Sequence, residues 1–216
     1  MVINWFGLSS LKISSGALVL VTDPFSKTLG LTPPRLQTDV TVISNIADKA
    51  YNNKESLGGD NTFVVDGPGE FDIRGLFIRG IDARNENKSK GEEFDHTTIY
   101  SIRMENIRLG FLGSIKQKQL SDEQIDELGD IDILFIPTGG KTVLDAEQAV
   151  TITNQVEPSI VIPMHYAQKG LKLKLDPVEQ FLKEIGSKPD PIDKLTIKKG
   201  DLDGQQTKVV LINPAR

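Results

Sequence analysis

Short apolar runs, each bounded by turns rich in glycine, serine or proline, dominate the first half of the chain. Runs of this kind are typical of β-strands that pack in a sheet. Strands are predicted at Val2–Phe6, Leu11–Ile13, Ala17–Val21, Val40–Ile43 and Thr62–Val65. Two hairpins are predicted to follow, one over Glu70–Ile81 with its turn at Gly75, the other over Thr97–Met104 and Ile107–Leu112. The first half is therefore expected to be almost entirely β-structure.

The second half alternates helical and strand patterns. Two helices are predicted to begin at capping residues, one at Ser121, which forms a capping box with Gln124, and one at Asp145. A third is predicted after Asp176, where apolar residues recur at helical spacing. Strands are predicted at Ile131–Ile136, Ile160–Ile162 and Lys208–Ile212. Strands followed by helix–strand alternation predict an α+β protein with two sheets and outer helices. No linker divides the chain, so residues 1–216 are expected to form a single domain.

The composition excludes several kinds of function and of metal site. The chain has 25 Lys and Arg against 30 Asp and Glu, a net charge of −5, and no concentrated basic region, so we expect no nucleic-acid binding. The absence of cysteine excludes disulfides, thiol catalysis and cysteine-based zinc sites. The two histidines, His96 and His165, are too few for a histidine-rich zinc centre, because a catalytic zinc normally takes three protein ligands.

No targeting or membrane segment is recognisable in the sequence. The amino terminus, MVINWFGLSS, lacks the positive region and the cleavage site of a signal peptide. The longest apolar run, Ala17–Val21, is far shorter than the ~20 residues that a membrane-spanning helix needs. A soluble, cytoplasmic protein without membrane partners is expected.

Five segments occur in an order and spacing that point to one family. They are Trp5–Ser10, Val21–Phe25, Gly67–Phe71, Asp132–Gly140 and Ile162–Tyr166. Together they resemble the metallo-β-lactamase-fold hydrolases, and most closely the branch that contains the L-ascorbate-6-phosphate lactonase. The resemblance extends from about residue 1 to residue 186. It implies an αββα metallo-β-lactamase-like sandwich, two mixed sheets flanked by helices, with an active site at one edge where strand ends deliver metal ligands.

The resemblance also locates the family's metal ligands, and most of those positions carry other residues. Leu8 stands where the family has its first histidine, and Ser114 where it has a bridging aspartate. The His-x-His-x-Asp-His motif aligns with Asn45, Ala47, Lys49 and Ala50, and a one-residue shift offers only Asp48 as an acid. His165 alone is retained. A lysine at this turn would repel a divalent cation, so the sequence predicts a protein without the zinc expected in the family.

Other candidate residues have simpler interpretations. Asp23 is predicted to be a turn acid that organises the site edge, and His96 to have a surface or supporting role. Gly139 and Gly140 are predicted to form a tight turn, with an anion cradle as the alternative. Asp48, Asp66, Glu70 and Asp95 are the carboxylates available for a site of oxygen ligands, but they are scattered along the sequence.

Two hypotheses for function follow. The first is a catalytically inactive homologue with a binding or structural role toward an unidentified small molecule or protein, acting as a homo-oligomer. The alternative is a metal-dependent hydrolase of the lactonase or phosphodiester type, with an unusual site around His165. Ser114 and His165 inherit positions that contact one metal cluster in the family, so a serine–histidine nucleophile is a further arrangement to test. It would also need an acid and an oxyanion hole, which the sequence does not show.

Overall fold

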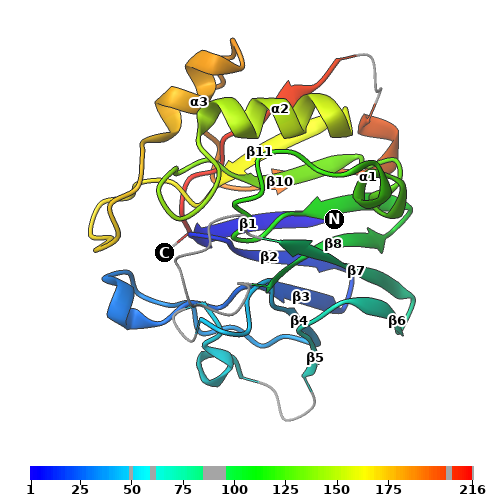
Figure 1. Cartoon of the computed structure of the whole chain (residues 1–216). Helices are drawn as coiled ribbons and strands as arrows, with labels where there is room; N and C mark the ends of the chain where they lie inside the picture. The colour runs from blue at the N-terminus through cyan, green and yellow to red at the C-terminus, as the bar shows by residue number, and fades with distance from the viewer. Residues whose placement is uncertain (49–50, 59–61, 85–95, 203–205, 216) are drawn as a thin grey trace.

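The computed structural model describes residues 1–48, 51–58, 62–84, 96–202 and 206–215, and it has two β-sheets packed face to face (Figure 1). The first sheet has the strand order β12-β1-β2-β3-β4-β5, and the second has the order β13-β11-β10-β9-β8-β7-β6. The first sheet consists of β1 (Val2–Gly7), β2 (Ser10–Ser15), β3 (Leu18–Thr22), β4 (Val40–Val42), β5 (Phe63–Val65) and β12 (Leu195–Thr196). The second consists of β6 (Gly69–Ile73), β7 (Leu76–Arg84), β8 (His96–Met104), β9 (Ile107–Phe111), β10 (Ile133–Pro137), β11 (Ile160–Met164) and β13 (Lys208–Val209).

Both sheets are mixed, as the sequence analysis expected. In the first sheet β3 pairs in parallel with β4, and β4 with β5, whereas β1, β2 and β3 are antiparallel neighbours. In the second sheet β6 to β9 form an antiparallel meander, and β9, β10, β11 and β13 run parallel. Parallel strands end at the same edge of a sheet, so the segments that follow β3, β4, β9, β10 and β11 are brought toward one side of the molecule.

Three α-helices cover the outer face of the second sheet. They are α1 (Asp122–Leu128), α2 (Ala146–Val156) and α3 (Val178–Glu184), and Figure 1 shows α2 and α3 above β10 and β11. The 3-10 turns η1 (Lys27–Leu29) and η2 (Lys54–Ser56) lie in connections of the first sheet, and η3 (Lys199–Asp201) follows β12. The helical flank is therefore heavier on one side than the family resemblance suggests. None of the described helices is both long and apolar enough to cross a membrane.

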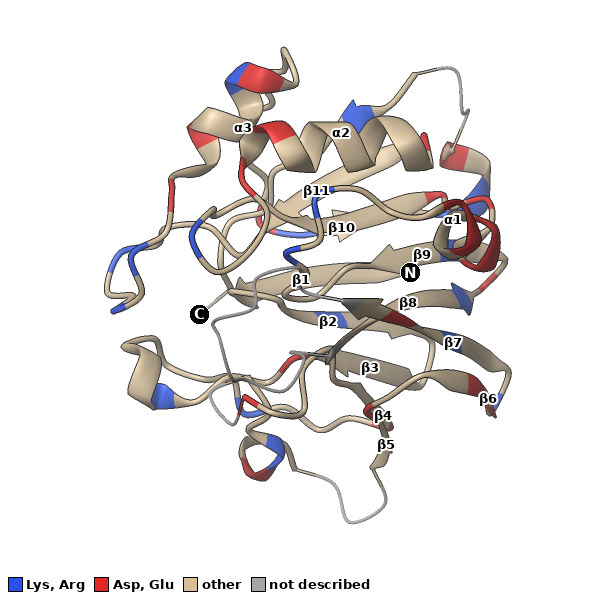
Figure 2. Ribbon diagram, in the orientation of Figure 1, with Lys and Arg blue, Asp and Glu red and all other residues tan. Residues whose placement is uncertain are grey.

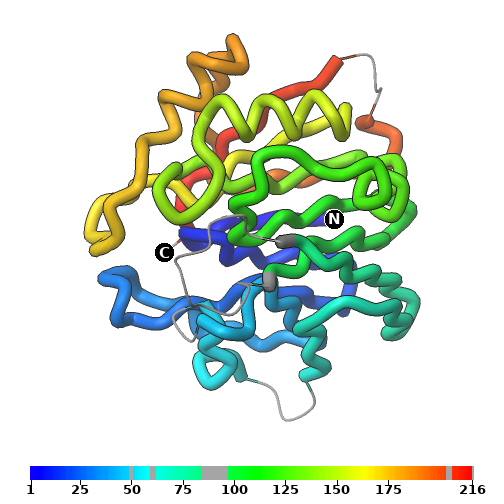
Figure 3. Tube along the Cα trace, viewed as in Figure 1, coloured from blue at the N-terminus to red at the C-terminus, as the bar shows by residue number. Residues whose placement is uncertain are grey.

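Two apolar layers hold these elements together. The larger layer lies between the sheets and includes Trp5, Leu20, Ile102 and Phe135, all of them buried. The second lies between the second sheet and the helices, where Phe181 of α3 is fully buried. The tube view in Figure 3 follows the chain through the fold, with the first 65 residues mainly below and most of the later residues above. Since each layer is filled by side chains from elements far apart in sequence, the fold has its own apolar core.

The predicted elements agree with the observed ones, apart from their ends. Both capping boxes form, at Ser121 with Gln124 and at Asp145 with Gln148. The third helix has Pro177 as its N-cap without a side-chain hydrogen bond, so Asp176 does not cap it. The last strand is shorter than the predicted Lys208–Ile212, and β12 was not predicted at all. With two residues, β12 is too short to carry a pattern of its own.

Candidate functional site

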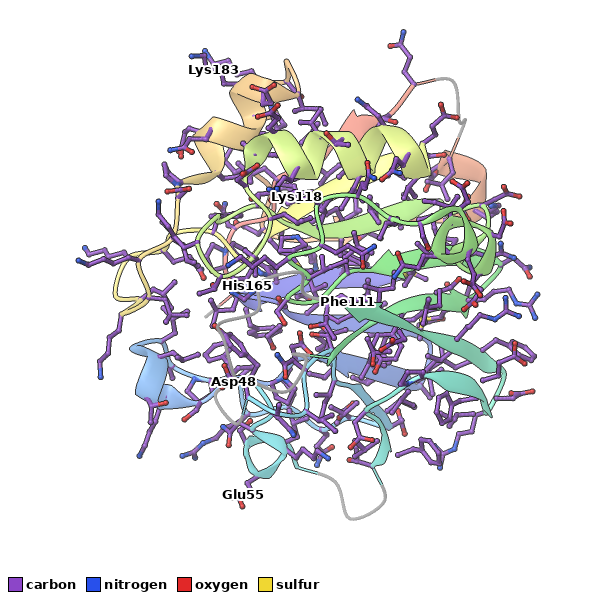
Figure 4. All side chains as sticks on the ribbon, in the orientation of Figure 1. Asp48, Glu55, Phe111, Lys118, His165 and Lys183 are labelled. Atoms are coloured by element: carbon purple, nitrogen blue, oxygen red, sulfur yellow. The ribbon has the colours of Figure 1, made fainter. Side chains whose placement is uncertain are left out.

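Four strand ends and one tight turn meet at one edge of the two sheets. The turn joins β1 to β2, and the strand ends are those of β3, β4, β9 and β11. The His165 N–H donates to the Leu8 carbonyl at 2.9 Å, and the Ser9 hydroxyl donates to the Gly113 carbonyl at 3.1 Å. In Figure 4, His165 lies in this region, above the loop that carries Asp48. The strand-end network, as we name it, consists of Leu8, Ser9, Asp23, Ser44, Gly113, Ser114 and His165.

His165, directly after β11, is fully buried and neutral. Its Nδ1 lies 2.8 Å from the Ser9 Oγ. Ser9 has one hydroxyl proton, and because a carbonyl can only accept, that proton goes to Gly113 and Nδ1 must donate to Ser9. Nε2 then carries the lone pair, and it has no hydrogen-bond partner within the described part of the chain. Burial lowers the pKa of His165 to about 3.

Asp23, directly after β3, is the buried acid of the network. Its Oδ1 accepts a hydrogen bond from the Ser44 N–H at 2.7 Å, and its Oδ2 accepts one from the Ser44 hydroxyl at 2.6 Å. Burial raises the pKa of Asp23 to about 7, although both bonds from Ser44 act to lower it. Both carboxyl oxygens are thus occupied in joining β3 to the end of β4. Asp23 is thus a turn acid, as the sequence predicted, and its role at the edge of a functional site stays a prediction.

Three residues of the network adopt a backbone conformation that side chains other than glycine rarely take. The φ angles are 50° at Leu8, 34° at Asp23 and 54° at His165. Each such residue costs of the order of 1 kcal/mol. Strained residues persist where the surrounding structure determines them strongly, and they are concentrated at functional sites. Three of the eight non-glycine residues with positive φ in the described part of the chain thus belong to the strand-end network.

Leu8 is buried in a small apolar cluster with Phe25, Leu29 and Tyr51. The Tyr51 ring also lies against the imidazole of His165, with ring centroids 5.4 Å apart. Burial, together with the charges of Asp48 and Asp23, raises the pKa of Tyr51 to about 12, so its phenol stays protonated. Leu8, which the resemblance places where the family has a metal-binding histidine, is therefore part of an apolar contact beside His165.

Of the other positions that the resemblance assigns to metal ligands, those that the structure describes offer few donor atoms. The side-chain oxygen of Asn45 accepts hydrogen bonds from the N–H groups of Ala47 and Asp48, closing the turn after β4. Ala47 is exposed. Ser114 is buried, and its N–H donates to the Ser44 Oγ at 3.3 Å. Lys49 and Ala50, and with them the expected repulsion of a cation by Lys49, lie outside the described residues.

The donor atoms of the network do not fit a zinc centre. Zinc in proteins takes three or four nitrogen, sulfur or carboxylate ligands. The network supplies the Nε2 of His165 and the carboxyl group of Asp23, whose oxygens each accept one hydrogen bond from Ser44, and two side chains fall short of three ligands. Within the described ranges, no three His, Asp or Glu side chains gather in a group that could hold a metal ion. The implied metal centre and the residues present disagree.

The structure does not form the proposed serine–histidine pair between Ser114 and His165. The histidine nitrogen that makes a hydrogen bond does so with Ser9. The Ser114 Oγ has no hydrogen-bond partner among the described residues. Sequence reasoning missed Ser9 as the partner, although it stands in the Trp5–Ser10 segment that carries the family resemblance. The reason is that Ser9 and His165 are brought together only by the packing of the two sheets.

Among the described residues, the scattered carboxylates do not form a site of oxygen ligands. Asp66 pairs with Lys54 at 2.9 Å, and Glu70 pairs with Arg79 at 2.6 Å, both at the surface. Asp95 and the side chain of His96 lie outside the description, although His96 begins β8 as a strand-start residue.

Gly139 and Gly140 form the tight turn that the sequence predicted. The Gly140 N–H donates to the Leu144 carbonyl at 2.8 Å, so it is not free for an anion. A side chain at Gly139 would overlap the His165 carbonyl oxygen, which explains why glycine stands there. The turn therefore supports the backbone at His165.

Comparison with known proteins places the chain among related sequences. Residues 2–165 match the family model described as the beta-lactamase superfamily domain. A UPF0173 metal-dependent hydrolase of Bacillus mycoides is 25% identical over 193 residues, which cover 76% of this chain and 84% of that protein. A UPF0173 protein of Pyrococcus furiosus is 39% identical over 57 residues, 26% of this chain and 25% of that protein.

Solved structures show the same fold. A metallo-beta-lactamase superfamily protein from Thermotoga maritima has a TM-score of 0.80 and 27% identity, and the match covers 98% of this chain and 97% of that one. Igni18, a metallo hydrolase of Ignicoccus hospitalis, has a TM-score of 0.63 at 17% identity and covers 100% and 96%. The αββα expectation is confirmed, whereas the lactonase branch stays a prediction.

Proposed function

The chain belongs to the beta-lactamase superfamily domain family, and from this premise we propose that it is a catalytically inactive member with a binding or structural role. Related proteins are named metal-dependent hydrolases. The proposal is that this chain keeps their scaffold without their metal chemistry. Any small-molecule or protein partner, and a homo-oligomeric state, belong to the same proposal.

One observation carries the proposal. The polar groups at the place where metal ligands would converge make hydrogen bonds to other residues of the protein. Ser44 occupies both oxygens of Asp23, and Ser9 occupies Nδ1 of His165. The imidazole is neutral, and a carboxyl group with a pKa of about 7 carries only about half a negative charge at pH 7, which is little charge for a cation to balance. A hydrogen-bonded core thus stands where the family has an ion.

The same groups are poorly suited to metal-free hydrolysis. A general base works best when its pKa lies near the working pH. His165, with a pKa of about 3, is neutral but weakly basic. Asp23 has a suitable pKa, but it is buried and both of its oxygens accept from Ser44. Neither group therefore supports an activated nucleophile.

One observation favours the alternative, a lactonase or phosphodiester hydrolase centred on His165. Within the described residues, the Nε2 of His165 and the Oγ of Ser114 are both buried and without hydrogen-bond partners. Buried polar atoms of this kind are costly unless something binds them. A ligand that binds these atoms would remove that cost, as the alternative requires.

Zinc content and hydrolysis separate the two hypotheses. Untagged protein is stripped with chelator, incubated with zinc or manganese, dialysed and analysed for metal, beside His165→Asn. Asparagine is chosen because it tolerates the positive φ at this position. We expect substoichiometric metal that is equal in both proteins, and no hydrolysis of bis(p-nitrophenyl) phosphate or a simple lactone above buffer. Stoichiometric zinc that His165→Asn loses, or turnover that it abolishes, would overturn the proposal.

A further inference from the structure

A pocket lies on the outer face of the second sheet, away from the strand-end network. It has a volume of about 460 Å³ and is bounded by β6 to β9 and the end of α1. Pockets for small molecules span roughly 300–1,000 Å³. The pocket shares no residue with the strand-end network, so its occupant is independent of what happens at His165.

Strand register brings two arginines together on the floor of this pocket. Arg103 of β8 stands directly opposite Arg108 of β9, and on its other side opposite Phe77 of β7. Side chains alternate along a strand, so Arg103 shares the outer face with Ser101, whereas Ile102 between them enters the core. Directly opposed residues have Cβ atoms about 5 Å apart, and like charges at that separation destabilise a sheet. The pair therefore favours an anion between its two members.

Neither arginine is neutralised by a described carboxylate. The neighbouring Arg79 is, since its Nε and Nη2 donate to Glu70 at 2.9 and 2.6 Å. The guanidinium of Arg103 instead lies 4.3 Å above the centre of the Phe77 ring, and no ion pair involving Arg103 or Arg108 occurs in the described ranges. Arg108 lies against Gly129 at the end of α1, where a side chain larger than hydrogen would overlap it.

The edge of the pocket is negatively charged, in contrast to the two arginines on its floor. Glu70, Asp72, Asp126 and Glu127 all line it, and Figure 2 shows acidic α1 close to basic positions of the neighbouring strands. A ligand with several negative charges would be repelled by these acids, whereas a single carboxylate can lie between the two guanidinium groups. The 42% exposure of Phe77 offers an apolar contact for the rest of such a ligand.

We propose that this pocket binds a small organic monocarboxylate with an aromatic or aliphatic body. The carboxylate lies between the guanidinium groups of Arg103 and Arg108, and the body packs against Phe77 and Leu128. This inference goes beyond the proposed function and does not depend on it, because a metal-loaded or active strand-end site would leave the pocket unchanged.

Titration with 3-phenylpropionate, followed by amide chemical shifts in solution NMR, tests the proposal. A ligand of this size is expected to bind with a dissociation constant of about 1 mM. Saturable shifts are expected on β7, β8, β9 and the end of α1. Arg103→Gln is the main variant, because Arg103 is exposed and its loss does not affect the core. We expect it to weaken binding about tenfold, as for the loss of a charge-assisted hydrogen bond.

Three controls separate the parts of the proposal. Arg35→Gln makes the same charge change at an exposed position outside the pocket and should leave affinity within about twofold. The uncharged 3-phenylpropanol should bind at least about tenfold more weakly than the carboxylate. Phenyl phosphate, a dianion at pH 8, should also bind more weakly. Equal binding by Arg103→Gln, shifts located elsewhere, or no saturable shift up to about 10 mM would overturn the proposal.

Discussion

The carboxyl group of Asp23 and the imidazole of His165 are both buried, and burial shifts their pKa values in opposite directions. The pKa of Asp23 rises to about 7 and that of His165 falls to about 3. In each case burial favours the uncharged form, because a charge loses its hydration in the interior. Each group instead makes its hydrogen bonds to a serine, Ser44 for Asp23 and Ser9 for His165. Near pH 7 the imidazole of His165 is therefore neutral and the carboxyl group of Asp23 is about half protonated.

The raised pKa of Asp23 predicts a stability that falls as the pH rises. The folded state holds the proton more tightly than the unfolded state, whose pKa is 3.8. The contribution of Asp23 is therefore complete below pH 3.8 and is lost as the pH approaches about 7. Asp23→Asn keeps the shape and does not titrate. From pH 4 to pH 8, its stability relative to wild type should rise by about 4 kcal/mol in urea unfolding.

The contribution of His165 to stability has the opposite pH dependence, and it cancels when Asp23→Asn is compared with wild type. Its folded pKa lies below its unfolded value of 6.5, so its contribution is complete above pH 6.5 and is lost as the pH falls toward 3. That loss is the same in wild type and Asp23→Asn, and it cancels in their difference. The exposed Asp126→Asn serves as control. A difference between Asp23→Asn and wild type that is flat with pH would contradict the prediction.

Gly113 and Gly16 form a matched pair of glycines. Both have positive φ, 54° and 56°, so alanine brings the same backbone strain at either position. At Gly16 nothing lies within 4 Å of the added carbon, whereas at Gly113 the added carbon would overlap Ser44. Gly16→Ala should cost about 1 kcal/mol, and Gly113→Ala at least about 3 kcal/mol. Equal costs in denaturant unfolding would show that the end of β9 can move away from Ser44.

At the scale of elements, helix ends follow local rules that do not depend on the rest of the fold. Asp145 accepts a hydrogen bond from the Gln148 N–H at 2.9 Å, and the Gln148 side chain accepts one from the Asp145 N–H at 3.2 Å. Asp145→Ala removes the cap of α2 and should destabilise the protein by about 1 kcal/mol in denaturant unfolding. Glu147 is exposed, so Glu147→Ala should change the free energy of unfolding by no more than about half a kcal/mol. Equal effects would mean that α2 is held by packing alone.

For the whole molecule, stability comes from the two apolar layers. The layer between the sheets contains fully buried Trp5, Phe111 and Phe135, and the layer under the helices contains Phe181. If no metal ion joins the strand ends, excess EDTA should leave the melting temperature within about 1 °C, unlike domains whose metal affinity is part of their folding energy. Thermal unfolding with and without EDTA measures this. A drop of several degrees that zinc restores would contradict the metal-free proposal.

The sequence by itself determined the features that depend on neighbouring residues. Strands were recognisable because short apolar runs end at turns, and the helix starts at Ser121 and Asp145 because a capping box spans only four residues. The prediction that Leu8, Asn45 and Ser114 stand in place of metal ligands also came from the sequence, since it needs only the resemblance to the family's motifs. The two-residue β12 could not be predicted, because it exists only through its pairing with β1.

Tertiary structure alone decided which side chains meet. Ser9 and His165 are 156 residues apart, and Asp23 and Ser44 are 21 apart, yet each pair is joined by a hydrogen bond shorter than 3 Å. The pairing of Ser9 rather than Ser114 with His165, and the position of Arg103 opposite Arg108, follow from strand packing and register, which local sequence does not encode. The pKa shifts of Asp23 and His165 also depend on the tertiary structure, because burial causes both of them. Burial depends on everything that surrounds a group in space and not on its neighbours along the chain.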